Sequence, residues 1–230
     1  TPPRLLGPTP LLRVRPSPPL FAVAPSPPAA MALVMHPDPP PPPRPPAHAA
    51  QGRAARASGG NVQAVIDYAL EQNLTAVVMD GIGVLSLEHE LVKPPDLSLM
   101  AQAIEHLRSR NAEESIELIW FGGVRTGTDI AKLISLGANA AMIGAAFSFG
   151  IGGRITSAGQ IQFDGNLSDE ERTNHARDLI GAFSAECSMM AKCTGKTNVH
   201  NLEPEDLRAL TLVTAKALNL RLPGRGLRSA

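Results

Sequence analysis

Several signals that would identify a function directly are missing from this sequence. It has only 2 cysteines in 230 residues, too few for a disulfide-rich secreted domain, and we expect both to be reduced. No apolar stretch of about 18 residues or more occurs, so we expect no membrane span. A P-loop, a G-x-G-x-x-G motif and a Ser-His-Asp constellation are also absent. The functional information is therefore concentrated in a few glycine-bearing segments.

Acidic residues are nearly absent from residues 1–58, which contain one acidic residue, Asp38, and six arginines. The same segment holds 18 of the 22 prolines and shows neither strand alternation nor a helical period. Such a sequence buries too little apolar surface to offset its ordering entropy, so we expect it to be disordered. The zero net charge of the whole chain hides this basic segment.

Three interpretations of residues 1–58 stay open. The segment resembles an organellar transit peptide, or it is a polyproline II linker or SH3-type ligand. We favour the third: because the chain starts at Thr1 and not at Met, we expect an incomplete gene product whose leading segment is not native to the folded part. The expected location is cytoplasmic, or a plastid or another organelle if the segment is a transit peptide.

The most specific stretch of the sequence is residues 116–150. Ile116–Phe121 is short and almost continuously apolar, which is typical of a strand buried on both faces of a parallel sheet. Gly122 and Gly123 follow; without a Cβ they allow unusual backbone angles and let a ligand approach the N–H groups. Arg125 adds a forked cation, and Thr126 or Thr128 can cap the next helix.

A second loop of the same kind follows one helix later. Residues 140–143 read as the next strand, and Gly144 and Ala145 open a second turn of small residues. In a (β/α)8 barrel, the loops after strands 7 and 8 often hold a phosphate together with a helix N-terminus. Two successive loops and Arg125 favour phosphate binding over a purely structural connection.

Two segments resemble known enzymes. GGVRTGTDIAKLISLGANAAMIG, residues 122–144, is similar to the phosphate-binding strands of FMN and phosphate-binding barrel enzymes, which include IMP dehydrogenase, glycolate-type flavin oxidases and the synthase domain of glutamate synthase. ECSMMAKCTGKTNVHNLEPEDLRALT, residues 186–211, resembles the segment just after the barrel in glutamate synthase and its stand-alone relatives. The resemblance covers about residues 74–224. It implies that the phosphate of FMN is held by Gly122, Gly123, Arg125, Gly127, Gly144 and Ala145.

The sequence departs from the glutamate synthase pattern at two places. That family has three cysteines in its iron–sulfur segment; Cys187 and Cys193 keep the first spacing, but Asn198 stands at the third position. Because a cluster is normally held by three or four thiolates, we expect no iron–sulfur cluster and no other metal. Residues 80–92 lack the family's Gly-Gly-Thr pattern. Asp80 is either a catalytic or ligand-contacting group or a polar loop residue.

The expected fold class is α/β, of the (β/α)8 TIM-barrel type, with only the C-terminal portion present (about strands 6–8) and a C-terminal helical extension. We divide the chain into residues 1–58, a partial FMN-binding barrel at 59–150, and a hairpin insertion with helical extension at 151–230. The remaining expected elements are helices at 62–72, 96–110, 168–192 and from 203 or 204 to 218, a strand at 75–79, and a hairpin within 152–165. Ser168 and Glu171 form the capping box of the long helix.

The resemblance implies an FMN-dependent oxidoreductase that acts on CH–NH2 donors. The complete enzyme would reductively aminate 2-oxoglutarate to glutamate, and we expect this chain alone to be inactive. The alternatives are an IMP dehydrogenase-like phosphate-binding barrel and a non-catalytic remnant or interaction module. The expected partner is a small molecule of the 2-oxoglutarate and glutamate class, with no nucleic acid and no membrane. The catalytic residues, the electron donor and the oligomeric state stay open, a homo-oligomer included.

Overall fold

The main sheet is built from consecutive βα units. The computed structural model describes residues 12–14, 52–83, 87–163 and 165–224. The sheet runs in the order β1-β2-β3-β4-β5, and its strands are β1 (Leu12–Val14), β2 (Gly52–Ala57), β3 (Ala76–Asp80), β4 (Glu117–Phe121) and β5 (Ala140–Met142). Strands β2 to β5 are parallel, and β1 pairs antiparallel with β2. Neighbouring parallel strands follow the chain order, as in a barrel; a doubly wound sheet would reverse it.

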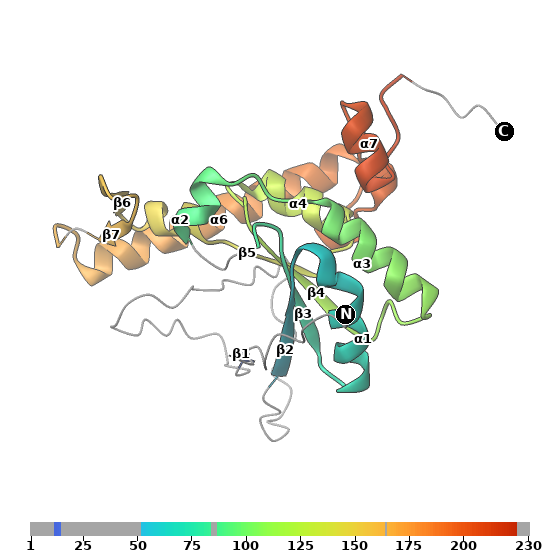
Figure 1. Ribbon diagram of the computed structural model, residues 1–230. Coiled ribbons are helices and arrows are strands. Elements are labelled where there is room, and N and C mark those ends of the chain that lie inside the picture. Colours follow the sequence, from blue (N-terminus) through green and yellow to red (C-terminus); the bar gives the residue numbers. More distant parts are fainter. Residues whose placement is uncertain (1–11, 15–51, 84–86, 164, 225–230) are drawn as a thin grey trace, which may run out of the picture.

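Helices connect the parallel strands and cover one face of the sheet (Figure 1). The connecting helices are α1 (Val62–Glu71), α3 (Ser98–Ser109) and α4 (Gly127–Ser135). Two short helices, α2 (Leu87–Val92) and α5 (Ala145–Gly150), follow β3 and β5. The rest of the described chain comprises the hairpin β6 (Gly153–Ile155) and β7 (Ile161–Phe163), the long helix α6 (Asp169–Cys193), and α7 (Leu212–Leu218) with the 3-10 turns η1 (Gly59–Asn61), η2 (Val199–Asn201) and η3 (Pro204–Asp206).

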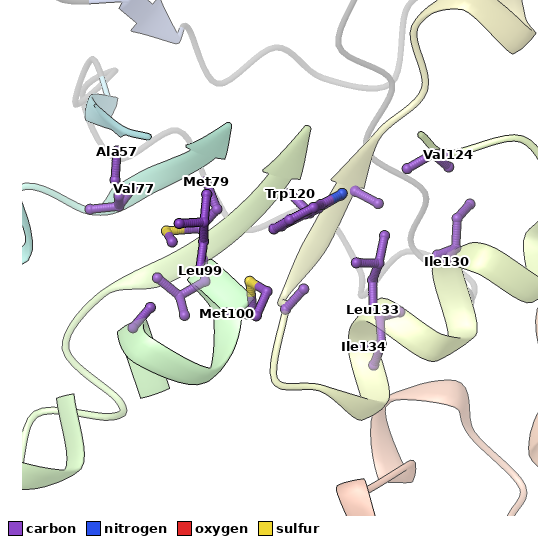
Figure 2. Packing of buried hydrophobic residues seen from close by; sticks show 14 of the residues in the cluster. Ala57, Val77, Met79, Leu99, Met100, Trp120, Val124, Ile130, Leu133 and Ile134 are labelled. Carbon is purple, nitrogen blue, oxygen red and sulfur yellow. The ribbon is translucent and has the colours of Figure 1, made fainter. Parts of the chain in front are cut away.

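The hydrophobic core lies between the sheet and these helices. Strand residues Val77, Met79 and Trp120 point toward α3 and α4, which contribute Leu99, Met100, Ile130, Leu133 and Ile134 (Figure 2). A smaller cluster on the other face of the sheet contains Ala54, Ala76, Val78, Phe121 and Met142. All five residues of β3 are buried. Strand β3 is therefore buried on both faces; in β4, for which this was predicted, Leu118, Trp120 and Phe121 are buried, Ile119 is half-buried and Glu117 is exposed.

Most predicted elements are present. The structure confirms the helices at α1 and α6, the strands β3, β4 and β5, and the hairpin. The capping box of α6 is formed as expected: the Ser168 hydroxyl accepts from the N–H of Glu171, whose carboxylate accepts from the N–H of Ser168. The architecture is α/β with a partial parallel barrel, as predicted.

Strand β2 was not predicted. Residues 52–57, GRAARA, fall in the segment expected to be disordered, yet they pair in parallel with β3 and bury Ala54 and Ala57. Alanine and arginine have little intrinsic preference for strands, so the neighbouring strand decides the conformation here. In the described residues the parallel sheet thus has four strands. Most of residues 1–58 lies outside the described residues.

The last predicted helix is wrong in its extent. The structure has the 3-10 turn η3 and, separately, α7 from Leu212. Leu207 is extended, and the N–H of Ala209 donates to the carbonyl of Arg221, so that backbone group is not available to a helix. The Thr211 side chain caps α7 by accepting from the N–H of Thr214.

The C-terminal helix α6 lies against the start of α4. A Cβ on Gly127 would lie 2.1 Å from the Phe183 carbonyl oxygen. The N–H of Thr128 donates to the Glu186 carboxylate at 3.0 Å, and the Cys187 thiol donates to the Gly127 carbonyl at 3.1 Å. Glycine at position 127 is therefore required by this close approach.

We expect Gly127→Ala to lower the free energy of unfolding by about 1–3 kcal/mol, because the added methyl overpacks the contact between α4 and α6. The matched control is Gly181→Ala, also in α6. No atom lies within 4 Å of a Cβ at that position, so alanine should stabilise the helix by about 0.5–1 kcal/mol. Urea denaturation of both variants measures the difference, and equal stabilities would contradict the packing account.

Candidate functional site

Three loops meet at the carboxyl edge of the parallel sheet. Strands β3, β4 and β5 end at Asp80, Phe121 and Met142. The segments that follow include the two glycine-bearing loops of the sequence analysis. Parallel strands bring their carboxyl ends to one edge, where α/β folds bind their ligands.

The loop after β4 has a conformation that requires glycine. Gly122 and Gly123 have φ angles of 115° and 72°, which L-residues rarely adopt. A Cβ on Gly123 would also lie 2.7 Å from Cγ of Pro95. The indole Nε1 of Trp120 donates to the Gly122 carbonyl at 2.7 Å and holds the turn in place. The predicted need for paired glycines therefore has a local structural cause.

Glu90 of α2 lies between the two predicted loops. Its side chain is 9% exposed, and its Oε2 accepts from the N–H of Ala145 at 2.7 Å. The N–H groups of Gly123 and Val124 also favour its charged form and so lower its pKa. Burial outweighs these N–H groups and raises the pKa of Glu90 above its usual value. Its Oε1 has no hydrogen-bond partner within the described part of the chain.

We call the backbone N–H groups of Gly123, Val124 and Ala145 the anion cradle. They come from two loops that are separated in sequence by the whole of α4, and all three stabilise the charge of one carboxylate, Ala145 through a hydrogen bond of 2.7 Å. Several backbone N–H groups directed at one point form an anion-binding site without any charged side chain. The arrangement can hold a carboxylate or one face of a phosphate.

The six predicted site residues divide into two groups. Gly122, Gly123, Gly144 and Ala145 belong to the two loops that form the cradle. Arg125 is elsewhere: its side chain is 81% exposed, with Nε 3.9 Å from the Asp129 carboxylate. Gly127 is buried where α4 packs on α6. The cofactor roles of all six remain predictions. No sequence signal distinguished Glu90 from neighbouring surface acids.

Asp80 organises the turn after β3. Its carboxylate is fully buried and pairs with the Arg56 guanidinium, whose Nε lies 2.9 Å from Oδ2. Oδ1 accepts from the N–H groups of Ile82 at 3.1 Å and Gly83 at 3.0 Å. All of these bonds are internal, so the geometry favours the structural alternative for this residue.

The two cysteines differ in environment. Cys187 is buried in α6, and burial raises its thiol pKa to about 11. Cys193 is exposed at the end of the same helix. Asn198, the position of the missing third cysteine, caps η2 with its side chain. Within the described ranges, no cluster of three or more His, Cys, Asp or Glu residues could hold a metal ion.

In the part of the chain that the structure describes, none of the helices combines the length and apolar character needed to cross a bilayer.

Residues 97–160, which include both loops of the cradle, match the family described as FMN-dependent dehydrogenase. A glutamate synthase large subunit-like protein of Rhizobium meliloti is 27% identical over 189 residues, 68% of this chain and 43% of that protein. The pre-mycofactocin synthase of Mycolicibacterium smegmatis is 31% identical over 94 residues, 41% of this chain and 19% of that protein. The chain spans less than half the length of each of these relatives.

The structure is also similar to flavoenzyme domains. The flavin-binding domain of baker's yeast flavocytochrome b2 aligns with a TM-score of 0.47 and 20% identity, covering 75% of this chain and 37% of that one. For (S)-mandelate dehydrogenase the TM-score is 0.46 and the identity 17%, with 66% and 34% covered. The predicted resemblance to FMN-binding enzymes is confirmed by the family match and the Rhizobium relative, and FMN is the cofactor of the matching family.

The thiol environments give a reactivity prediction. At about pH 8 a thiol-specific reagent should modify one cysteine per folded chain, because Cys187 stays protonated and buried while Cys193 is exposed. Cys193→Ser should abolish this labelling, and the unfolded parent should show two reactive thiols. Rapid modification of Cys187 in the folded Cys193→Ser variant would contradict the described packing of α6.

Proposed function

We propose that this chain supplies the phosphate-binding part of an FMN-binding barrel domain in a flavin-dependent oxidoreductase. The observation that carries the proposal is the convergence of the cradle N–H groups, from the loops after β4 and β5, on one anionic group. The position at the carboxyl edge supports the proposal, because barrel enzymes hold phosphates there. The match of residues 97–160 to FMN-dependent dehydrogenases supports the identity of the ligand.

The residues of the cradle fit a phosphate group. The present occupant is a carboxylate, which shows the same hydrogen-bond acceptor chemistry as a phosphate oxygen. The glycines carry no side chain that would cover the N–H groups of the loop. Arg125 lies one residue beyond the cradle and would contribute a long-range positive charge from its exposed position.

When bound, FMN supplies the redox chemistry itself. The part of this chain is to bind and orient the phosphate end through the cradle, with the loop geometry maintained by Trp120 and Pro95. In the described residues the parallel sheet has four strands, half of what a closed barrel needs. The complete flavin site would therefore also use residues beyond these four strands.

For the substrate, we propose the glutamate synthase class: reduction of the imine formed from 2-oxoglutarate and ammonia. The support is the resemblance of residues 186–211 to the segment after the glutamate synthase barrel and the name of the Rhizobium relative. A hydroxy-acid substrate is the competing possibility, because the matching family is described as dehydrogenases. Turnover of each substrate by the complete flavoprotein distinguishes the two.

The proposal predicts that the glycine loop controls flavin binding. Gly123→Val should weaken FMN binding at least tenfold, or about 1.4 kcal/mol or more, because a β-branched residue is strained at φ 72° and would meet Pro95. Titration of FMN fluorescence with the full chain measures this. Gly159→Ala is the control: it also has positive φ, 78°, but lies in the hairpin turn. Equal losses in the two variants would refute a specific role of the loop.

Arg125→Ala should have a smaller effect on FMN affinity, about twofold to fivefold, because an 81% exposed guanidinium is strongly screened by water. Lys132→Ala provides the matched control, since Lys132 is another exposed cation beside Asp129. The FMN affinity of Lys132→Ala should equal that of the parent. If both variants lose the same affinity, Arg125 acts only through the general charge of α4.

A further inference from the structure

The cradle is occupied by a side chain of this protein. Glu90 lies on the short helix α2, which packs against α5, and its carboxylate reaches the N–H of Ala145. It is buried but only partly satisfied, since Oε1 has no partner within the described part of the chain. A buried carboxylate with an unpaired oxygen is costly. An anion that accepts from the same N–H groups would therefore compete with Glu90 for this place.

Among the described residues, no charged side chain contributes to the shift in the Glu90 pKa. The influences on its pKa are burial, which raises it, and the backbone N–H groups of the cradle, which lower it. Helix α5 has no ionisable residue. In the β4–α4 loop Arg125 lies beside Asp129, and on the α2 side His89 is exposed while the Lys93 ammonium donates to the Ile82 carbonyl. Within the described ranges, the groups that stabilise the charged form of Glu90 are therefore backbone N–H groups.

We propose that Glu90 is an intramolecular competitor for the anion site: its carboxylate fills the cradle in the free chain and must leave before a phosphate or another oxyanion binds. This inference rests on the proposed function of the cradle. The apparent affinity for an anion is then reduced by the fraction of chains in which Glu90 occupies the site. Flavin binding is thereby coupled to the position of α2.

The competition depends on pH in a defined direction. The pKa of Glu90 is higher in the cradle than in water, so the occupied cradle binds a proton more readily than the open one. Protonation therefore favours occupancy by Glu90, and this contribution is lost as the pH rises through the raised pKa. Anion affinity should increase with pH over that range and become constant above it.

The test compares Glu90→Ala with Glu71→Ala in the full chain. Alanine at position 90 removes the competitor. Glu71 is an exposed carboxylate at the end of α1, shortly before β3 begins, and so lies at the opposite edge of the sheet. The probes are FMN, followed by flavin fluorescence, and sulfate, followed by the amide NMR signals of Gly123 and Ala145. Glu90→Ala should bind both about tenfold more tightly than the parent, and Glu71→Ala should equal the parent.

A second variant tests the same inference through charge alone. In Glu90→Gln the side chain still fills the cradle but does not titrate. Between about pH 5 and about pH 8 the parent should gain sulfate affinity severalfold, whereas Glu90→Gln should show no pH dependence. Sulfate is suitable because its charge is constant in this range, unlike that of a phosphate monoester. If Glu90→Ala does not fold, the comparison of the parent with Glu90→Gln still tests whether Glu90 competes with anions for the cradle.

The outcomes separate the inference from the proposed function. Equal affinities of the parent and Glu90→Ala, or equal pH profiles of the parent and Glu90→Gln, overturn the role of Glu90 and leave the cradle intact. Binding of neither FMN nor sulfate by any variant overturns the cradle itself. Binding by Glu90→Ala alone supports both.

Discussion

Close packing at positions that cannot carry a side chain organises the carboxyl edge of the sheet. A Cβ on Gly81 would lie 2.4 Å from the Trp120 ring, and one on Gly123 would lie 2.7 Å from Pro95. The same constraint holds Gly127 against α6. These contacts fix the β4–α4 loop from both sides and attach the C-terminal helix to it. The geometry of the cradle and the docking of α6 therefore depend on one set of glycines.

Two buried carboxylates at this edge have opposite roles. Asp80 is completely paired, with a guanidinium on one oxygen and two backbone N–H groups on the other. Such a carboxylate is a permanent part of the turn, because removing any partner would leave a buried charge uncompensated. Glu90 accepts a hydrogen bond from the Ala145 N–H and is further stabilised by the N–H groups of Gly123 and Val124, and its Oε1 has no partner among the described residues. Because both oxygens of Asp80 have partners, this carboxylate is structural. Within the described part of the chain Glu90 has an oxygen without a partner, so its carboxylate is displaceable.

The matched relatives are longer than this chain. The family match extends from α3 to the turn between β6 and β7, and the Rhizobium relative aligns with 68% of this chain and 43% of its own length. In the described residues the parallel strands β2 to β5 follow chain order without a reversal. That order places the loops after β4 and β5 side by side, which is the arrangement that barrel enzymes use for phosphates.

The sequence by itself determined the elements whose signals are local: the apolar strands β3 and β4, the capped helix α6, the hairpin and the glycines after β4. It could not determine β2, because GRAARA becomes a strand only beside β3, nor the end of the last helix, where Ala209 bonds to Arg221. Two loops were expected to admit an anion, but that they face one point was decided by the parallel sheet. Only the tertiary structure placed Glu90 there, because a contact between residues 90 and 145 leaves no pattern in a single sequence.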